Sequence, residues 1–143
     1  MKSWEEFTKR YGTSTTSNVQ LTEWAKELGI PNFSCIMRNE LLSLDNSRDH
    51  NIIINLQTEE ERGTHWEALR TKGDAAYYFS SYALPPLKEA KEFTANKKER
   101  CYNTLSLQKQ QEYCGQMALY VLYRLTHGVP FLDIILSLFK KDE

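Results

Sequence analysis

The stretch from Gln108 to Leu125 reads QKQQEYCGQMALYVLYRL and forms the centre of the expected fold. From Met117 onward it is almost entirely apolar, so apolar residues would lie on every face of a helix. A helix that is apolar on every side lies inside a protein, so the stretch predicts a buried helix. Cys114 and Gly115 stand at its start, where the positive end of the helix dipole and unpaired N–H groups favour a thiolate. A lone cysteine in such a place is more often core packing, so a catalytic role needs support from other residues.

The composition predicts one soluble intracellular domain. Of the 143 residues, 41% are hydrophobic and 26% are charged, and the formal net charge of −1 gives no general case for nucleic-acid binding. The three cysteines form no CxxC motif, so we expect neither a metal site nor a disulfide framework, and no cofactor is implied. Such cysteine usage is typical of the cytoplasm or nucleus. No apolar run approaches the roughly 18 residues of a membrane helix, and the amino terminus lacks a signal peptide's apolar core, so no membrane contact is expected.

Apolar periodicity and turn residues predict an α+β domain in which helices pack around a small mixed sheet of four or five short strands. A run of three isoleucines makes residues 51–56 the strongest strand, and Lys72-Gly73-Asp74 predicts the turn of a β-hairpin. Thr22 is expected to cap the second helix and residues 39–50 to form a loop. Residues 1–20 are expected to be a partly flexible lead-in to a single domain over residues 21–143. The expected strands are 33–37, 51–56, 65–71, 75–80 and 101–107, and the expected helices are 3–10, 21–28, 87–95, 114–127 and 130–138.

A cysteine nucleophile needs a base within hydrogen-bonding reach and donors for the oxyanion. His65 stands at the head of the first hairpin strand beside a glycine turn, a position suited to the mouth of a cleft. Gln108 lies between the last strand and the buried helix, where its amide and the Cys114 backbone N–H would together hold an oxyanion. Taken alone, each of these residues is more often an incidental polar residue than a catalytic one.

The order and spacing of five segments carry a family resemblance over most of the chain. The sequence resembles the adenovirus-type cysteine proteases, which share one broad fold group with the SUMO-specific proteases. It is most similar to the adenain-like proteases of Maverick/Polinton elements and related large DNA viruses. The segments are Gly29 to Arg38, Ile53 to Trp66, His65-Trp66 itself, Tyr77 to Pro86, and the Gln-x5-Cys-Gly motif from Gln108 to Gly115.

The resemblance implies a papain-like/adenain-like cysteine protease fold, with the buried helix starting at the nucleophile. It makes His65 the general base, Cys114 the nucleophile and Gln108 the oxyanion-hole side chain. At the position of the family's catalytic acid, an Asp or Glu, this sequence has Ser80. A serine hydroxyl accepts a hydrogen bond but carries no charge to stabilise an imidazolium, so we expect activity to be weakened but not abolished. We also expect Ser80→Asp to speed cleavage.

Three functions remain open from the sequence. The first is a cysteine endopeptidase that cleaves polypeptide precursors, such as capsid-type proteins, of a virus or virus-derived element. The second is a catalytically decayed protease fold that binds peptides, for which Ser80 is the evidence. The third, ranked last, is a protease of SUMO or ubiquitin-like modifiers. The resemblance also makes DNA and a short activating peptide candidate partners, and packaging in virions a candidate location.

Overall fold

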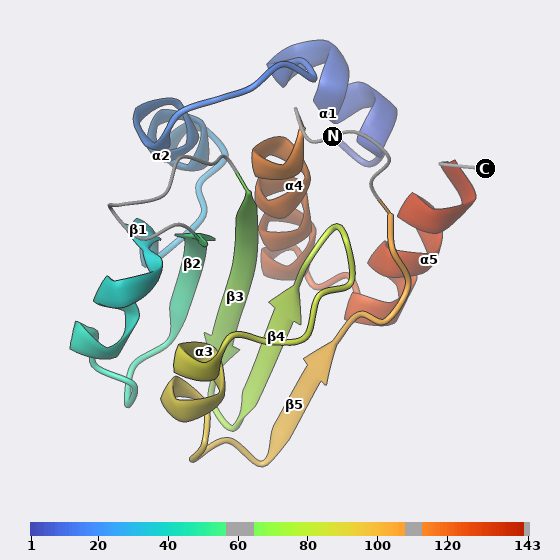
Figure 1. Ribbon diagram of the computed structural model, residues 1–143. Coiled ribbons are helices and arrows are strands. Elements are labelled where there is room, and N and C mark those ends of the chain that lie inside the picture. The colour runs from blue at the N-terminus through green and yellow to red at the C-terminus, as the bar shows by residue number, and fades with distance from the viewer. Residues whose placement is uncertain (57–64, 108–112, 142–143) are drawn as a thin grey trace.

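A five-stranded mixed sheet forms the centre of the molecule (Figure 1). The computed structural model describes residues 1–56, 65–107 and 113–141. The strands lie in the order β1-β2-β3-β4-β5, with β1 parallel to β2, antiparallel pairing from β2 through β4, and β5 parallel to β4. This arrangement confirms the expected α+β class and mixed sheet. The bounds are β1 Phe33–Met37, β2 His50–Asn55, β3 Trp66–Lys72, β4 Ala75–Phe79 and β5 Glu99–Tyr102.

Helices cover both faces of the sheet, as Figure 1 shows. The long helix α4 packs on one face against β3, whereas α3 and the short 3-10 helix η1 pack on the other. Two separate apolar cores result, one on each face. The bounds are α1 Trp4–Tyr11, α2 Asn18–Glu27, η1 Arg38–Ser43, α3 Lys88–Phe93, α4 Cys114–Thr126 and α5 Phe131–Lys141.

Helix α4 is buried along most of its length, as its apolar sequence predicts. Met117, Ala118 and Val121 have no exposed surface, and α4 contacts α1, α2, α5 and the sheet. Phe7 of α1 is also fully buried in this core, so the first helix is packed into the fold. The proposed division of the chain at residue 20 stays a prediction.

Three details of the expected secondary structure are wrong. Helix α2 begins at Asn18, and its cap is Ser17, whose Oγ accepts from the Gln20 N–H at 3.2 Å, whereas Thr22 donates to a carbonyl inside the helix. The segment expected as a loop at 39–50 contains η1, because Leu41 is buried in the core on the α3 side.

The last strand is the third difference, since it runs over Glu99–Tyr102 and not over 101–107. Asn103 ends it. The Asn103 side chain accepts from the Ser80 N–H at 3.0 Å and donates to the Ser80 carbonyl at 2.6 Å. A side chain thus takes the backbone groups of Ser80 that a longer β5 would pair with, and the chain is free to turn toward α4.

Candidate active site

Cys114 is the first residue of α4 and is 1% exposed. Its Sγ accepts a hydrogen bond from the backbone N–H of Trp66 at 3.4 Å. The helix dipole places partial positive charge at the same end of α4. A hydrogen-bond donor and partial positive charge beside the sulfur are features that suit a nucleophilic cysteine.

Gly115 lets the start of α4 approach β3 and the segment before α2. A Cβ at this position would lie 2.7 Å from Cγ2 of Thr16 and 3.2 Å from Cδ1 of Trp66. The first distance is shorter than side chains tolerate, so a larger residue would force either the Thr16 side chain or the start of the helix to move. The glycine of the Cys-Gly pair therefore has a packing reason, because it keeps the thiol against β3.

His65 immediately precedes β3 and lies beside Cys114. Its Nε2–H donates to Oε2 of Glu67 at 3.1 Å, and its ring packs against the Tyr82 ring with a centroid separation of 5.1 Å. The other ring nitrogen, Nδ1, is buried. With Nε2 engaged by Glu67, Nδ1 is the nitrogen left for the thiol. Such nucleophile–base contacts are commonly loose before substrate binds.

The contacts of His65 change its protonation. Burial alone lowers the pKa of His65, but hydrogen bonding to the Cys114 thiol and to the Glu67 carboxylate outweighs burial and raises the pKa to about 9. At neutral pH the ring is therefore protonated, and a positive imidazolium stands beside the sulfur. This arrangement favours a thiolate–imidazolium pair, the reactive form of a cysteine protease dyad.

Ser80, at the expected acid position, makes no hydrogen bond to His65 in the described part of the chain. It is fully buried just after β4, where its Oγ accepts from the Leu84 N–H at 3.2 Å. Its backbone groups bond to Asn103 and Ala83. The hydroxyl thus stabilises the turn after β4 and does not orient the imidazole.

The group that does contact the imidazole is Glu67, which sequence reasoning missed. Glu67 has no exposed surface, and its second oxygen, Oε1, accepts a hydrogen bond from the Tyr78 hydroxyl. A signal for Glu67 is present in the sequence, since residues two apart on a strand share a face, and His65 and Glu67 are so spaced. Tyr78 has no comparable local signal because it comes from another strand.

One expected site residue lies outside the described residues, and the two other histidines lie outside this cluster. Gln108 falls in the segment 108–112 that the structure does not describe, so its oxyanion role stays a prediction. His50 and His127 bond to the backbone carbonyls of Asp45 and Tyr123, away from Cys114. Across residues 1–56, 65–107 and 113–141, no group of His, Cys, Asp and Glu side chains could hold a metal ion.

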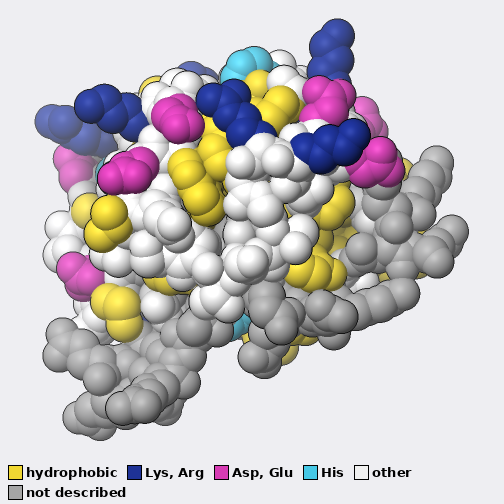
Figure 2. All heavy atoms as spheres, turned by 90° about the horizontal axis from the view of Figure 1, so that it is seen from above, with side chains coloured by type: hydrophobic (Ala, Val, Ile, Leu, Met, Phe, Trp, Pro, Cys, Tyr) yellow, Lys and Arg dark blue, Asp and Glu magenta, His cyan; other side chains and the backbone are white. Residues whose placement is uncertain are grey.

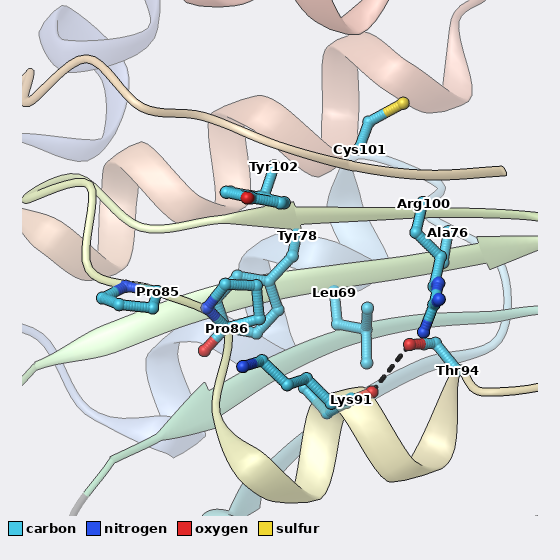
Figure 3. A pocket seen from close by; sticks show the side chains of 11 residues that line it. Leu69, Ala76, Tyr78, Pro85, Pro86, Lys91, Thr94, Arg100, Cys101 and Tyr102 are labelled. Carbon is cyan, nitrogen blue, oxygen red and sulfur yellow. Dashed lines mark hydrogen bonds between the residues drawn. The ribbon is translucent and has the colours of Figure 1, made fainter.

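A pocket of about 410 Å³ lies on the α3 side of the sheet, away from Cys114 (Figure 3). Leu69, Tyr78, Pro85 and Pro86 form its apolar wall. Its link to the candidate site is Tyr78, whose ring faces this pocket while its hydroxyl contacts Glu67. The pocket is therefore lined by Tyr78, which contacts the Glu67 side chain that bonds to His65, but it is not lined by Cys114.

Solved structures with a similar fold include viral cysteine proteases. The ASFV pS273R protease has a TM-score of 0.66 and 16% identity, over 91% of this chain and 66% of its own. The fold is that of the adenain-like cysteine proteases. A Se-Met structure of the same protease gives a TM-score of 0.61 and 14% identity, over 91% of this chain and 67% of its own. The structure of AvrA delL154 with IP6 and CoA has a TM-score of 0.50 and 15% identity, over 77% of this chain and 47% of its own.

The similarities to solved structures establish the fold alone. No protein-family model matches the sequence, and no curated protein matches it. The chain spans 66% of the length of the first pS273R protease structure. None of the helices in the described ranges is long and apolar enough to cross a membrane.

Proposed function

We propose that the protein is a cysteine endopeptidase that cleaves precursor proteins of a virus or virus-derived element through Cys114 and His65. The observation that carries this proposal is the placement of a buried thiol at the start of α4, with the Trp66 N–H on its sulfur and a protonated His65 beside it. The similarity in fold to a viral protease supports the same class of enzyme.

The reaction would be acyl transfer in two steps. The Cys114 thiolate attacks the scissile carbonyl carbon and forms a C–S bond, while the carbonyl oxygen becomes an oxyanion that the Cys114 N–H and Gln108 amide would hold. His65 then gives its proton to the leaving amine as the C–N bond breaks. In the second step His65 takes a proton from water, which hydrolyses the thioester and releases the acid and the thiolate.

The proposed substrates are polypeptide precursors such as capsid-type proteins, and the family resemblance supports the adenain-like branch of Maverick/Polinton elements as the source. DNA and an activating peptide are proposed on the same resemblance. The face drawn in Figure 2 gives DNA little support, because its Lys and Arg side chains lie among Asp and Glu side chains. In the short basic cluster at residues 97–100, Lys97 donates to the Gly73 carbonyl and Lys98 lies 3.9 Å from Asp74.

Cleavage of a diverse peptide library, read by mass spectrometry of the new termini, tests the proposal. The wild-type protein should release products, with and without added DNA, and Cys114→Ala should release none. Cys35→Ala and Cys101→Ala are matched controls that should retain activity, because neither thiol lies at the start of α4. Cleavage that survives Cys114→Ala would contradict the proposal, and peptide binding without cleavage would favour the decayed protease fold.

A further inference from the structure

We propose that Glu67 is the positioning carboxylate of His65, in place of the acid that the family resemblance puts at Ser80, and that Tyr78 holds it in position. The inference rests on the proposed function, since a positioning residue has a role only if Cys114 and His65 form a dyad. Glu67 would be the third member of a triad with Cys114 and His65, whose acid the sequence lacks at the position of Ser80.

Both oxygens of Glu67 are engaged, although the side chain has no exposed surface. Oε2 accepts from Nε2 of His65 at 3.1 Å, and Oε1 accepts from the Tyr78 hydroxyl. A buried carboxylate is costly unless charged or polar partners replace the water it loses. Here the partners are one imidazolium and one phenol, so the pair with His65 is the charge interaction that keeps Glu67 in this site.

The pairing of β3 with β4 explains how the carboxylate that contacts His65 can come from β3 and not from position 80. Ala68 faces Phe79 and Leu69 faces Tyr78, and β4 ends at Phe79. Extended by one residue, this antiparallel register would set Glu67 opposite Ser80. Residues opposed in such a pair point to the same face with Cβ atoms about 5 Å apart. A carboxylate on either strand would therefore reach the same imidazole.

Serine at position 80 is the expected complement of glutamate at position 67. Two carboxylates side by side in a buried site repel each other, and one of them takes up a proton. The Ser80 hydroxyl adds no charge, and its Oγ accepts from the Leu84 N–H. The missing acid at Ser80 is thus the counterpart of a carboxylate on β3 and not evidence of decay.

The proposed chemistry follows from which nitrogen each partner takes. By accepting from Nε2–H, Glu67 fixes the ring so that Nδ1 is available to the Cys114 thiol, and its negative charge stabilises the imidazolium that results. The proton passes from sulfur to Nδ1. Burial and the neighbouring Glu67 charge both raise the pKa of Tyr78, so its hydroxyl stays protonated and donates to Oε1.

A charge swap between the two strands tests the assignment. Glu67→Gln keeps the shape of the side chain but removes its charge, and it should lower kcat/KM by about 10- to 1000-fold. Ser80→Asp alone should not raise activity, contrary to the expectation from sequence, because Glu67 already occupies the site. The Glu67→Gln, Ser80→Asp double variant should regain at least about tenfold over Glu67→Gln, because the charge returns from the opposite strand.

A measurement that needs no substrate separates positioning from a structural effect. The His65 ring signals, assigned by their loss in His65→Ala, are titrated by NMR. Glu67→Gln should lower the pKa of His65 toward that of an ordinary histidine, and the double variant should raise it again. Glu89→Gln is the matched control. It changes a carboxylate on α3 that is paired with Arg38 of η1, and it should leave the His65 titration unchanged.

Tyr78 provides an independent variant if Glu67→Gln fails to fold, as judged by circular dichroism. Tyr78→Phe removes only the donor to Oε1 and should lower kcat/KM several-fold with a smaller fall in the His65 pKa. Tyr77→Phe, on the opposite face of the same strand, should have no effect on either readout.

The outcomes distinguish the inference from the proposed function. If the wild type cleaves peptides and neither Glu67→Gln nor Tyr78→Phe changes activity or the His65 titration, the inference is overturned and the protease proposal stands. If the wild type cleaves nothing but the His65 pKa still falls in Glu67→Gln, the contact is upheld while the proposed function fails.

Discussion

Cys114 and Cys35 are two thiols of one core with opposite surroundings. Cys35 lies within β1 opposite Ile53, and burial alone raises its pKa to about 12. Cys114 is buried more deeply, yet a backbone N–H contacts its sulfur and a protonated His65 lies beside it. The difference teaches that burial by itself suppresses a thiolate, and that a reactive thiol inside a protein needs charge and hydrogen-bond partners that burial makes stronger.

Removal of the base should erase most of the difference between the two thiols. His65→Ala should lower kcat/KM by about 100- to 10,000-fold, because it takes away both the imidazolium and the proton donor for the leaving amine. Steady-state cleavage of the best library peptide measures the effect. His127→Ala is the control, since His127 bonds to the Tyr123 carbonyl at the far end of α4, and it should retain wild-type activity. Equal losses in the two variants would contradict the assignment of His65.

Displacing the start of α4 should weaken the Cys114 environment through packing. Gly115→Ala places a methyl group 2.7 Å from Cγ2 of Thr16 and should lower the free energy of unfolding by about 1–3 kcal/mol, measured by urea denaturation. Thr16→Ser deletes that methyl and should restore part of the loss in the double variant, while having little effect alone. If Gly115→Ala is neutral, the close packing that holds the thiol against β3 is not required.

Alkaline pH should remove the stabilisation that protonated His65 provides beside Cys114. Because the pKa of His65 is raised from 6.5 to about 9, protonated His65 contributes stability that is complete below about pH 6.5 and is lost as the pH rises through about 9. Between neutral and strongly alkaline pH, Tm should therefore fall further in the wild type than in His65→Gln. Parallel Tm curves for the two proteins would show that the ion pair adds no stability.

The parts of the fold that follow from local pattern were predictable from the sequence. The apolar run after Cys114 predicts a buried helix, and strand β1 has the expected bounds, Phe33–Met37. Patterns of apolar residues report which side of an element is buried, and burial dominates these segments. The order of Cys114 and His65 and the family resemblance predict a catalytic pair, and that role stays a prediction.

The contact of Tyr78 with Glu67 was not predictable because it depends on strand register. Tyr78 reaches Glu67 only because the hairpin pairs Leu69 with Tyr78, and a one-residue slip would turn these side chains to the other face. The backbone of the turn after β4 was also not predictable from local sequence. Ala83 has a φ of 57° there, a left-handed conformation that costs alanine about 1–2 kcal/mol.

The most direct test of the central claim compares the three thiols in one experiment. Limiting iodoacetamide is added at about pH 6, where an ordinary thiol is almost entirely protonated, and the labelled cysteines are read by mass spectrometry. A Cys114 thiolate paired with His65 should label faster than exposed Cys101 and much faster than Cys35, and His65→Ala should abolish that advantage. Labelling of Cys114 no faster than Cys35 would contradict the account, because the thiol would then be part of the core and not a nucleophile.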